Sequence, residues 1–179
     1  MRVITGTARG RRLATPENYD IRPTTDNVKE SIFNIIQFDI EGRKVLDLFA
    51  GTGQLGIECL SRGAESATFV DENKEAIRIV KENLKTCQLK ATVIQADAIT
   101  FLRNCGKFDV IFVDPPYDSK LYKPVLETIN SVDILSDGGI IVCEARKEEL
   151  LPEMELPYKK RKEYKYGRLK VCIYTKETE

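Results

Sequence analysis

The sequence predicts an α/β protein with a mostly parallel seven-stranded sheet and helices on both of its faces. From residue 44 onward, short apolar stretches of strand length alternate with amphipathic helical stretches, which is the pattern of parallel sheets with crossover helices. The run at 110–113 (Val-Ile-Phe-Val) is apolar at every position, as is typical of a strand buried on both faces. A length of 179 residues fits one compact domain with a substantial core.

The first part of the chain precedes this alternation. Residues 1–22 are basic and rich in turn-forming residues, so we expect a short N-terminal β extension there. We assign residues 23–179 to the main domain. Thr24 and Thr25 can cap a helix that has apolar residues along one face and ends near Gln37.

The remaining elements follow in order along the chain. Asn73 is expected to cap one crossover helix, and Pro124 fits the first turn of the last one, where a missing N–H does no harm. We expect a turn at 137–139 (Asp-Gly-Gly). The predicted strands are 45–49, 67–70, 91–94, 109–113, 140–143 and two more flanking Tyr166-Gly167; the predicted helices begin at 55, 74, 97 and 124.

Composition limits the functional classes. The sequence has no histidine, which excludes Ser-His and Cys-His catalysis and histidine-ligated metal sites. Its five cysteines are scattered and form no C-x-x-C pair, so we expect reduced thiols and no metal. No stretch approaches the roughly 20 apolar residues that cross a bilayer, and residues 1–6 lack the core of a signal peptide. We therefore expect a cytoplasmic protein that does not bind membranes.

The most distinctive stretch is 108–117, where an apolar strand stops at Asp114-Pro115-Pro116-Tyr117. Two prolines cannot continue a strand ladder, because they lack N–H donors. Asp114 is therefore expected at the carboxyl end of a central strand, the edge at which open α/β sheets bind ligands. A carboxylate, a free carbonyl and a phenol ring on one rigid loop form a candidate active site, although a strand end closed by Pro-Pro would give the same local pattern.

A second motif predicts a nucleoside-containing cofactor. Residues 51–56 match G-x-G-x-x-G directly after a strand and at the start of a helix, and Asp71 follows Gly51 by twenty positions. Glycines allow a ligand to approach the backbone, and an acid after the next strand can accept hydrogen bonds from ribose hydroxyls. The same pattern serves NAD. Asp47, however, lies four residues before Gly51, where its charge favours a cofactor with a positive amino-acid portion over a pyrophosphate, and Asp97 can serve an adenine amino group.

These motifs resemble those of class I methyltransferases that use S-adenosylmethionine, which implies a Rossmann-like fold. Residues 47–53 (Asp-Leu-Phe-Ala-Gly-Thr-Gly) are similar to the first motif, 70–73 to the ribose motif and 95–98 to the adenine motif. Residues 114–117 resemble the narrower catalytic motif of the branch that methylates planar nitrogens. The resemblance implies cofactor contacts from Asp47, Phe49, Gly51, Thr52, Gly53, Asp71, Glu72, Asp97, Ala98 and Asp114.

Over nearly its whole length the chain resembles the RsmD family, which implies a 16S ribosomal RNA (guanine-N2)-methyltransferase. The implied partner is 16S rRNA in an assembled or assembling small subunit. Gln54 stands where familiar members often have a small residue, which leaves the cofactor assignment intact. The similar segments are Ile4-Thr5-Gly6, Arg9-Gly10-Arg11-Arg12-Leu13, Arg22-Pro23-Thr24-Thr25-Asp26, Lys29-Glu30-Ser31-Ile32-Phe33-Asn34 and Leu60-Ser61-Arg62-Gly63-Ala64.

Such an acceptor gives each residue of the Asp-Pro-Pro-Tyr loop a role. The lone pair of an exocyclic guanine amine is delocalised into the ring, so the amine is a poor nucleophile until it pyramidalises. The Asp114 carboxylate and the Pro115 carbonyl can accept the two amine hydrogens, Pro116 stiffens that carbonyl, and Tyr117 can stack on the base. The base must leave its stack to reach these groups.

Two basic segments are candidates for RNA binding. In the family the N-terminal extension leads toward the site, which makes Arg9, Arg11, Arg12, Arg22 and Thr24 the first candidates. Residues 159–170 are also strongly basic, with tyrosines interleaved, although such tyrosines commonly pack across strands. Three alternatives stay open from the residues: an adenine-N6 methyltransferase, a glutamine-amide methyltransferase, and a non-catalytic RNA-binding assembly factor on the same fold.

Overall fold

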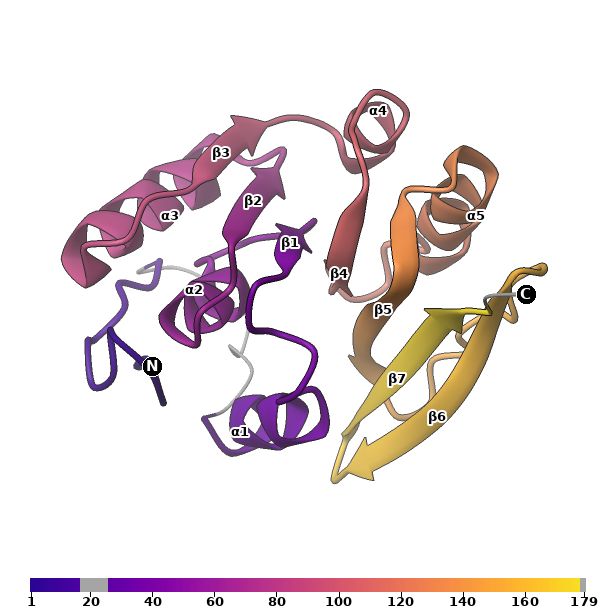
Figure 1. Cartoon of the computed structure of the whole chain (residues 1–179), viewed down its shortest axis with the longest axis horizontal. Helices are drawn as coiled ribbons and strands as arrows, with labels where there is room; N and C mark the ends of the chain where they lie inside the picture. The colour runs from indigo at the N-terminus through magenta and orange to yellow at the C-terminus, as the bar shows by residue number, and fades with distance from the viewer. Residues whose placement is uncertain (17–25, 178–179) are drawn as a thin grey trace.

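The computed structural model describes residues 1–16 and 26–177. Its centre is a seven-stranded sheet in the order β3-β2-β1-β4-β5-β7-β6 (Figure 1). The helices are α1 (Asp26–Ile35), α2 (Gln54–Ser61), α3 (Lys74–Cys87), α4 (Ala98–Leu102) and α5 (Tyr122–Val132). The strands are β1 (Lys44–Asp47), β2 (Ser66–Asp71), β3 (Thr92–Gln95), β4 (Phe108–Val113), β5 (Leu135–Arg146), β6 (Tyr158–Tyr166) and β7 (Leu169–Lys176).

The sheet is mixed rather than wholly parallel. Strands β1 to β5 pair in parallel, while β7 lies antiparallel between β5 and β6. The β6–β7 hairpin causes this change of direction, because two strands joined by a tight turn must run antiparallel. Gly167 occupies that turn with a φ of 58°, a conformation that favours glycine. The prediction of a mostly parallel sheet ending in two strands around Tyr166-Gly167 is confirmed.

Strand β5 corrects one boundary. The expected turn at 137–139 was wrong, because these residues belong to a strand that begins at Leu135. Phe108 of β4 pairs with Leu135, whereas Val110 pairs with Ile140, so the extra residues form a bulge in the ladder. The Asp-Gly-Gly sequence, which is typical of a turn, accommodates this bulge instead.

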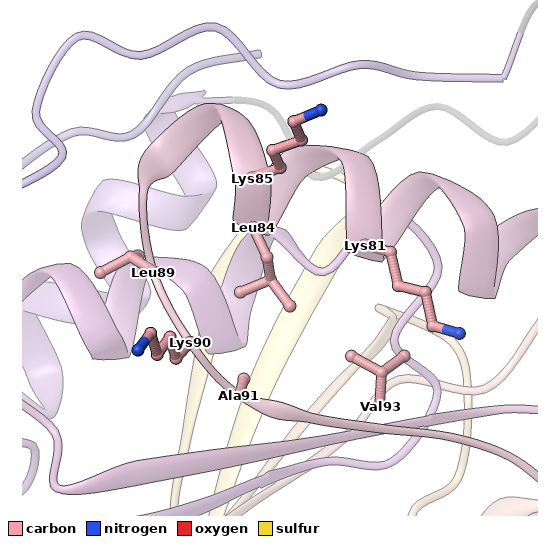
Figure 2. A pocket seen from close by; sticks show the side chains of 7 residues that line it. All are labelled: Lys81, Leu84, Lys85, Leu89, Lys90, Ala91 and Val93. Carbon is pink, nitrogen blue, oxygen red and sulfur yellow. The ribbon is translucent and has the colours of Figure 1, made fainter.

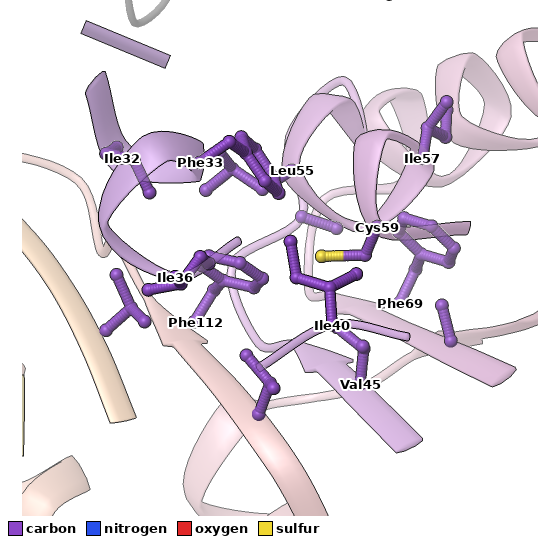
Figure 3. Packing of buried hydrophobic residues seen from close by; sticks show 14 of the residues in the cluster. Ile32, Phe33, Ile36, Ile40, Val45, Leu55, Ile57, Cys59, Phe69 and Phe112 are labelled. Atoms are coloured by element: carbon purple, nitrogen blue, oxygen red, sulfur yellow. The ribbon is translucent and has the colours of Figure 1, made fainter. Parts of the chain in front are cut away.

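Helices cover both faces of the sheet, as predicted, and each face has its own hydrophobic core. The core under α1, α2 and α3 includes Val45, Phe69 and Phe112 (Figure 3), and the core under α4 and α5 includes Leu46 and Ile111. Successive side chains of a strand point to opposite faces, so neighbours such as Val45 and Leu46 enter different cores. The central strands are therefore buried on both sides, and their ends are held rigidly.

The N-terminal residues pack on the helical layer beside α2 and α3 (Figure 1). The Glu58 carboxylate of α2 accepts hydrogen bonds from the backbone N–H groups of Ile4, at 2.8 Å, and Thr5, at 3.0 Å. Asn83 of α3 accepts from the N–H of Ala14 and donates to its carbonyl. Within residues 1–16, the expected β structure consists of one isolated bridge, between residues 2 and 12. These hydrogen bonds hold the N-terminal extension against α2 and α3.

Two expectations from composition have structural counterparts. All five cysteines are free thiols, four of them buried, as their scattered spacing predicted. Among the helices of residues 1–16 and 26–177, none has the length and apolar character that crossing a membrane requires.

Candidate active site

A cavity of about 650 Å³ opens at the carboxyl ends of the parallel strands. Residues that follow β1, β2, β3 and β4 line it, together with one residue of β5 and the end of the described N-terminal segment, Thr15 and Pro16. The structure brings together all but one of the predicted cofactor and catalytic residues in this lining: Asp47, Phe49, Gly51, Thr52, Asp71, Glu72, Asp97, Ala98, Asp114, Pro115, Pro116 and Tyr117.

Gly53 is the predicted residue that does not line the cavity. It immediately precedes α2 with a φ of 77°, and its carbonyl accepts the Ile57 N–H at 2.9 Å. A Cβ at this position would lie 3.2 Å from both Phe69 and Val80. The absence of a side chain at Gly53 thus allows the start of α2 to pack closely against β2 and α3.

Asp71 ties the glycine-rich turn to the end of β2. One carboxylate oxygen accepts the Gly51 N–H at 2.9 Å, and the other accepts the Asn73 N–H at 2.9 Å. Asn73 in turn caps α3, as predicted, by accepting the N–H groups of Glu75 and Ala76. Gly51 has a φ of 54°, and nothing lies within 4 Å of where a Cβ would project. The turn therefore presents bare backbone to the cavity.

Asp47 is a buried carboxylate at the end of β1. Its side chain is 2% exposed, and one oxygen accepts the Gly56 N–H at 3.0 Å. Burial raises the pKa of Asp47 to about 7; the charge of Asp71 adds to this rise, and the bond from Gly56 opposes it. Near neutral pH this group can hold or release a proton, so a cation in the cavity would favour its charged form.

Asp97 has a different setting at the cavity rim. It caps α4, where one oxygen accepts both the N–H and the hydroxyl of Thr100 at 2.8 Å. These bonds lower the pKa of Asp97 below its ordinary value. Asp97 is therefore a solvated carboxylate that also orders the turn after β3.

Asp114 follows the last residue of the central strand β4, as the sequence predicted. Burial raises the pKa of Asp114 well above its ordinary value, and the charges of Glu144 and Asp47 raise it further. Pro115 is buried and Pro116 exposed, so the two prolines mark the boundary between core and solvent.

Tyr117 completes the Asp-Pro-Pro-Tyr loop and stacks with an arginine. The guanidinium carbon of Arg146 lies 4.4 Å from the centre of the Tyr117 ring, and the same group lies 3.3 Å from the Asp118 carboxylate. Burial and the charge of Asp114 raise the pKa of Tyr117 to about 12. The ring is thus held as a neutral phenol beside Asp114.

Glu144 of β5 is a cavity residue that the sequence reasoning missed. It is 3% exposed and lines the same cavity. Because Val113 pairs with Cys143 across parallel strands, the next residues, Asp114 and Glu144, lie level on neighbouring strands. The signal in the sequence was a single acid within the apolar run 140–145, between Cys143 and Ala145.

The predicted RNA-binding residues fall into different places. Arg9, Arg11 and Arg12 are exposed on the N-terminal extension, whereas Arg22 and Thr24 lie outside the described residues. The basic segment 159–170 forms β6 and the start of β7, at the far edge of the sheet from β3. Its tyrosines pack against the two hydrophobic cores, so they serve the hairpin itself: Tyr158, Tyr164 and Tyr166.

A second hollow, of about 480 Å³, lies between α3 and β3 (Figure 2). Its apolar floor contains Leu84 and Val93, and we call it the lysine groove after Lys81, Lys85 and Lys90, which also line it. Figure 2 shows Lys85 extending away from this floor, whereas Lys81 reaches down beside Val93. Ala14, three residues after Arg11, exchanges two hydrogen bonds with Asn83 of α3. The N-terminal extension that carries the three exposed arginines thus contacts α3, the helix that also forms one side of the lysine groove.

Comparisons with known proteins agree with this architecture. The family model described as "Conserved hypothetical protein 95" matches residues 1–175. The Bacillus subtilis protein named "Putative rRNA methyltransferase YlbH" is 44% identical, covering 98% of this chain and 99% of that protein. Escherichia coli "Ribosomal RNA small subunit methyltransferase D" is 33% identical over 100% of this chain and 91% of its own. The solved structure titled "Putative methyltransferase yhhF from Escherichia coli" superposes with a TM-score of 0.89 at 32% identity, covering 100% and 99% of the two chains.

Proposed function

The chain belongs to the RsmD family, and on that premise we propose that it transfers a methyl group from S-adenosylmethionine to the exocyclic N2 of a guanine in small-subunit (16S) ribosomal RNA. One observation carries the proposal: the Asp114-Pro115-Pro116-Tyr117 loop closes the same cavity that holds the glycine-rich turn and Asp71. A methyl acceptor held by this loop would thus lie beside the cofactor. The assignment places the activity in the cytoplasm, where ribosomal subunits are assembled.

The residues fit S-adenosylmethionine. A volume of about 650 Å³ is in the range of roughly 300 to 1,000 Å³ that small-molecule sites occupy. The bare backbone at Gly51 leaves room for a sugar, and each Asp71 oxygen keeps a lone pair for a ribose hydroxyl. Asp47 supplies negative charge for the ammonium group of the amino-acid portion, and Asp97 lies beyond β3 for the adenine. When bound, the cofactor supplies a methyl group already activated on a sulfonium.

The chain's own groups prepare the acceptor. The Asp114 carboxylate and the Pro115 carbonyl accept the two hydrogens of the amine and turn its lone pair toward the cofactor side of the cavity. As the new N–C bond forms, the amine loses one proton, and Asp114 is the group placed to take it. Its raised pKa makes it more basic than an exposed aspartate, which suits a proton acceptor.

The base has to be extruded from its stack, because the loop is set inside a cavity that an RNA helix cannot enter. Tyr117 offers a ring face for the extruded base, while Arg146 stacks on the same ring and holds it in place.

For the RNA backbone we propose a surface that runs from Arg9, Arg11 and Arg12 to the lysine groove. Phosphates are bound mainly through exposed Lys and Arg side chains. Within the described residues, the arginines and the groove lysines form no ion pair with a carboxylate. Arg22 and Thr24, which lie outside the described residues, are proposed as further RNA contacts on the ground of the family resemblance alone.

The test is methyl transfer from radiolabelled S-adenosylmethionine to small-subunit particles and to free rRNA, followed by digestion to nucleosides. We expect labelled N2-methylguanosine from at least one of the two substrates. Label in N6-methyladenosine or in glutamine would replace the proposal by one of the other amine methyltransferases. A protein that binds particles but neither binds the cofactor nor transfers label would be a non-catalytic assembly factor.

A further inference from the structure

The cavity presents two carboxylates side by side where the methyl acceptor would lie. Asp114 follows β4 and Glu144 lies in β5, level with each other on neighbouring strands. Strands in a sheet are about 4.8 Å apart. Both residues line the cavity, and the charge of Glu144 is strong enough at Asp114 to contribute to the rise in its pKa. This part of the cavity therefore presents two carboxylates, those of Asp114 and Glu144.

Bases differ in what they present to such a wall. The Watson–Crick edge of guanine carries two adjacent donors, the N1–H and the N2 amine, whereas the edge of adenine carries one donor amine beside the N1 lone pair. Resting on the proposed function, we propose that Glu144 determines base specificity by accepting the N1–H of the target guanine while Asp114 accepts from its N2 amine. Adenine would place its N1 lone pair against the Glu144 carboxylate.

Burial makes this discrimination strong. Glu144 is 3% exposed, so water has little room to compensate for a lost or repulsive contact. Sites built to hydrogen-bond a substrate group reject analogues that lack it far better than apolar pockets reject analogues of different size. The pair thus favours guanine without any contact to the rest of its ring.

The experiment compares guanine with 2-aminopurine at the modified position of the RNA. 2-Aminopurine keeps the 2-amine, which is the methyl acceptor, but has an N1 lone pair where guanine has N1–H. For the unchanged protein we expect transfer to 2-aminopurine RNA to be slower than transfer to guanine RNA by roughly tenfold or more, which corresponds to one charge-assisted hydrogen bond. With Glu144→Gln, whose amide can donate to the N1 lone pair, we expect this ratio to fall toward one.

The Glu144→Asp variant provides the matched control, since it keeps the charge and must keep a preference for guanine. Binding of S-adenosylhomocysteine and the melting temperature report whether each variant is folded. Equal rates on the two RNAs for the unchanged protein would overturn the inference, and so would an unchanged ratio in the folded Gln variant. If the Gln variant does not fold, the inference is tested by the ratio of transfer rates on guanine RNA and 2-aminopurine RNA, measured for the unchanged protein and for Glu144→Asp. Equal rates in both proteins would overturn it. Absence of N2-methylguanine with the unchanged protein would instead refute the proposed function.

Discussion

The two hollows of the molecule differ in charge, in enclosure and in origin. The cavity of about 650 Å³ is formed at the ends of parallel strands and is lined by six carboxylates. The lysine groove of about 480 Å³ is formed by the side of α3 against the edge strand β3, and three of its seven lining residues are lysines. In the cavity the charges converge from separate elements onto one space. In the groove the charged lysine side chains are exposed.

This difference has consequences for the chemistry of each hollow. Burial raises the pKa values of both Asp47 and Asp114. The pKa of Asp47 is raised to about 7, so its protonation can respond to a ligand near neutral pH. Exposed lysines remain fully hydrated, and added salt screens their attraction for anions. The cavity is therefore suited to a reaction and the groove to salt-sensitive binding of a polyanion. Each of the following variants removes a charge from either the cavity or the lysine groove, so that the two hollows can be compared.

The largest effect is expected from Asp114→Ala. We expect the rate of methyl transfer at saturating substrates to fall by roughly 100- to 10,000-fold, because the amine loses both its positioning partner and its proton acceptor. Binding of S-adenosylhomocysteine, measured by calorimetry, is expected to change by less than about fivefold, since other strands provide most of the cofactor contacts. Asp118→Asn, in the same loop but exposed, is the control and is expected to retain activity. A fully active Asp114→Ala protein would remove the loop from the mechanism.

A second effect concerns the buried charge of Asp47. The pKa of Asp47 rises from 3.8 to about 7 on folding, so the folded state binds the proton more tightly than the unfolded state. Stability from this group is present below pH 3.8 and is lost as the pH rises through about 7. The shift corresponds to up to about 4 kcal/mol. We therefore expect Asp47→Asn, which lacks this titration, to gain stability relative to the unchanged protein between pH 4 and pH 7.

The same substitution is expected to weaken cofactor binding. Without a carboxylate near the ammonium group, the affinity for S-adenosylhomocysteine should fall by roughly tenfold at pH 8, where the unchanged protein carries the charge. Denaturant unfolding and calorimetry across the pH range measure the two properties. Parallel pH profiles for the two proteins would show that Asp47 does not titrate in this window.

Much of the cavity was predictable from local patterns, while Glu144 was not. Asp47 and Asp71 are the last residues of β1 and β2, Asp114 directly follows β4, and the carboxyl ends of parallel strands share one edge of the sheet. Glu144 instead lies within β5, and its position in the cavity depends on the pairing of β5 with β4. That pairing includes a bulge at 137–139, which the sequence presents as a turn. Features set by strand register could not be inferred from one strand alone.

The lysine groove offers a third, smaller effect. Replacing Lys81, Lys85 and Lys90 together by Gln is expected to weaken RNA binding by roughly tenfold at moderate salt and to reduce the slope of log affinity against log salt by up to about 3. Cofactor binding is expected to remain unchanged, because the groove is separate from the cavity. The control replaces three lysines of β6 instead: Lys159, Lys162 and Lys165. A larger loss in this control would move the RNA surface to the opposite edge of the sheet.

The smallest effect is expected at Asp97, a cavity carboxylate that resembles the groove lysines in its exposure. Its pKa is lowered by hydrogen bonds from Thr100, so it is charged throughout the neutral range and binds a neutral adenine amine only weakly. Asp97→Asn keeps a good helix cap, so we expect stability to change by less than about 0.5 kcal/mol and cofactor affinity to fall by about twofold to fivefold. Asp97→Ala removes the cap of α4 and is expected to cost about 1 kcal/mol of stability as well. Chemical denaturation separates the two variants. If Asp97→Asn lost as much cofactor affinity as Asp47→Asn, burial of a carboxylate would not determine how strongly it contributes to cofactor binding in this cavity.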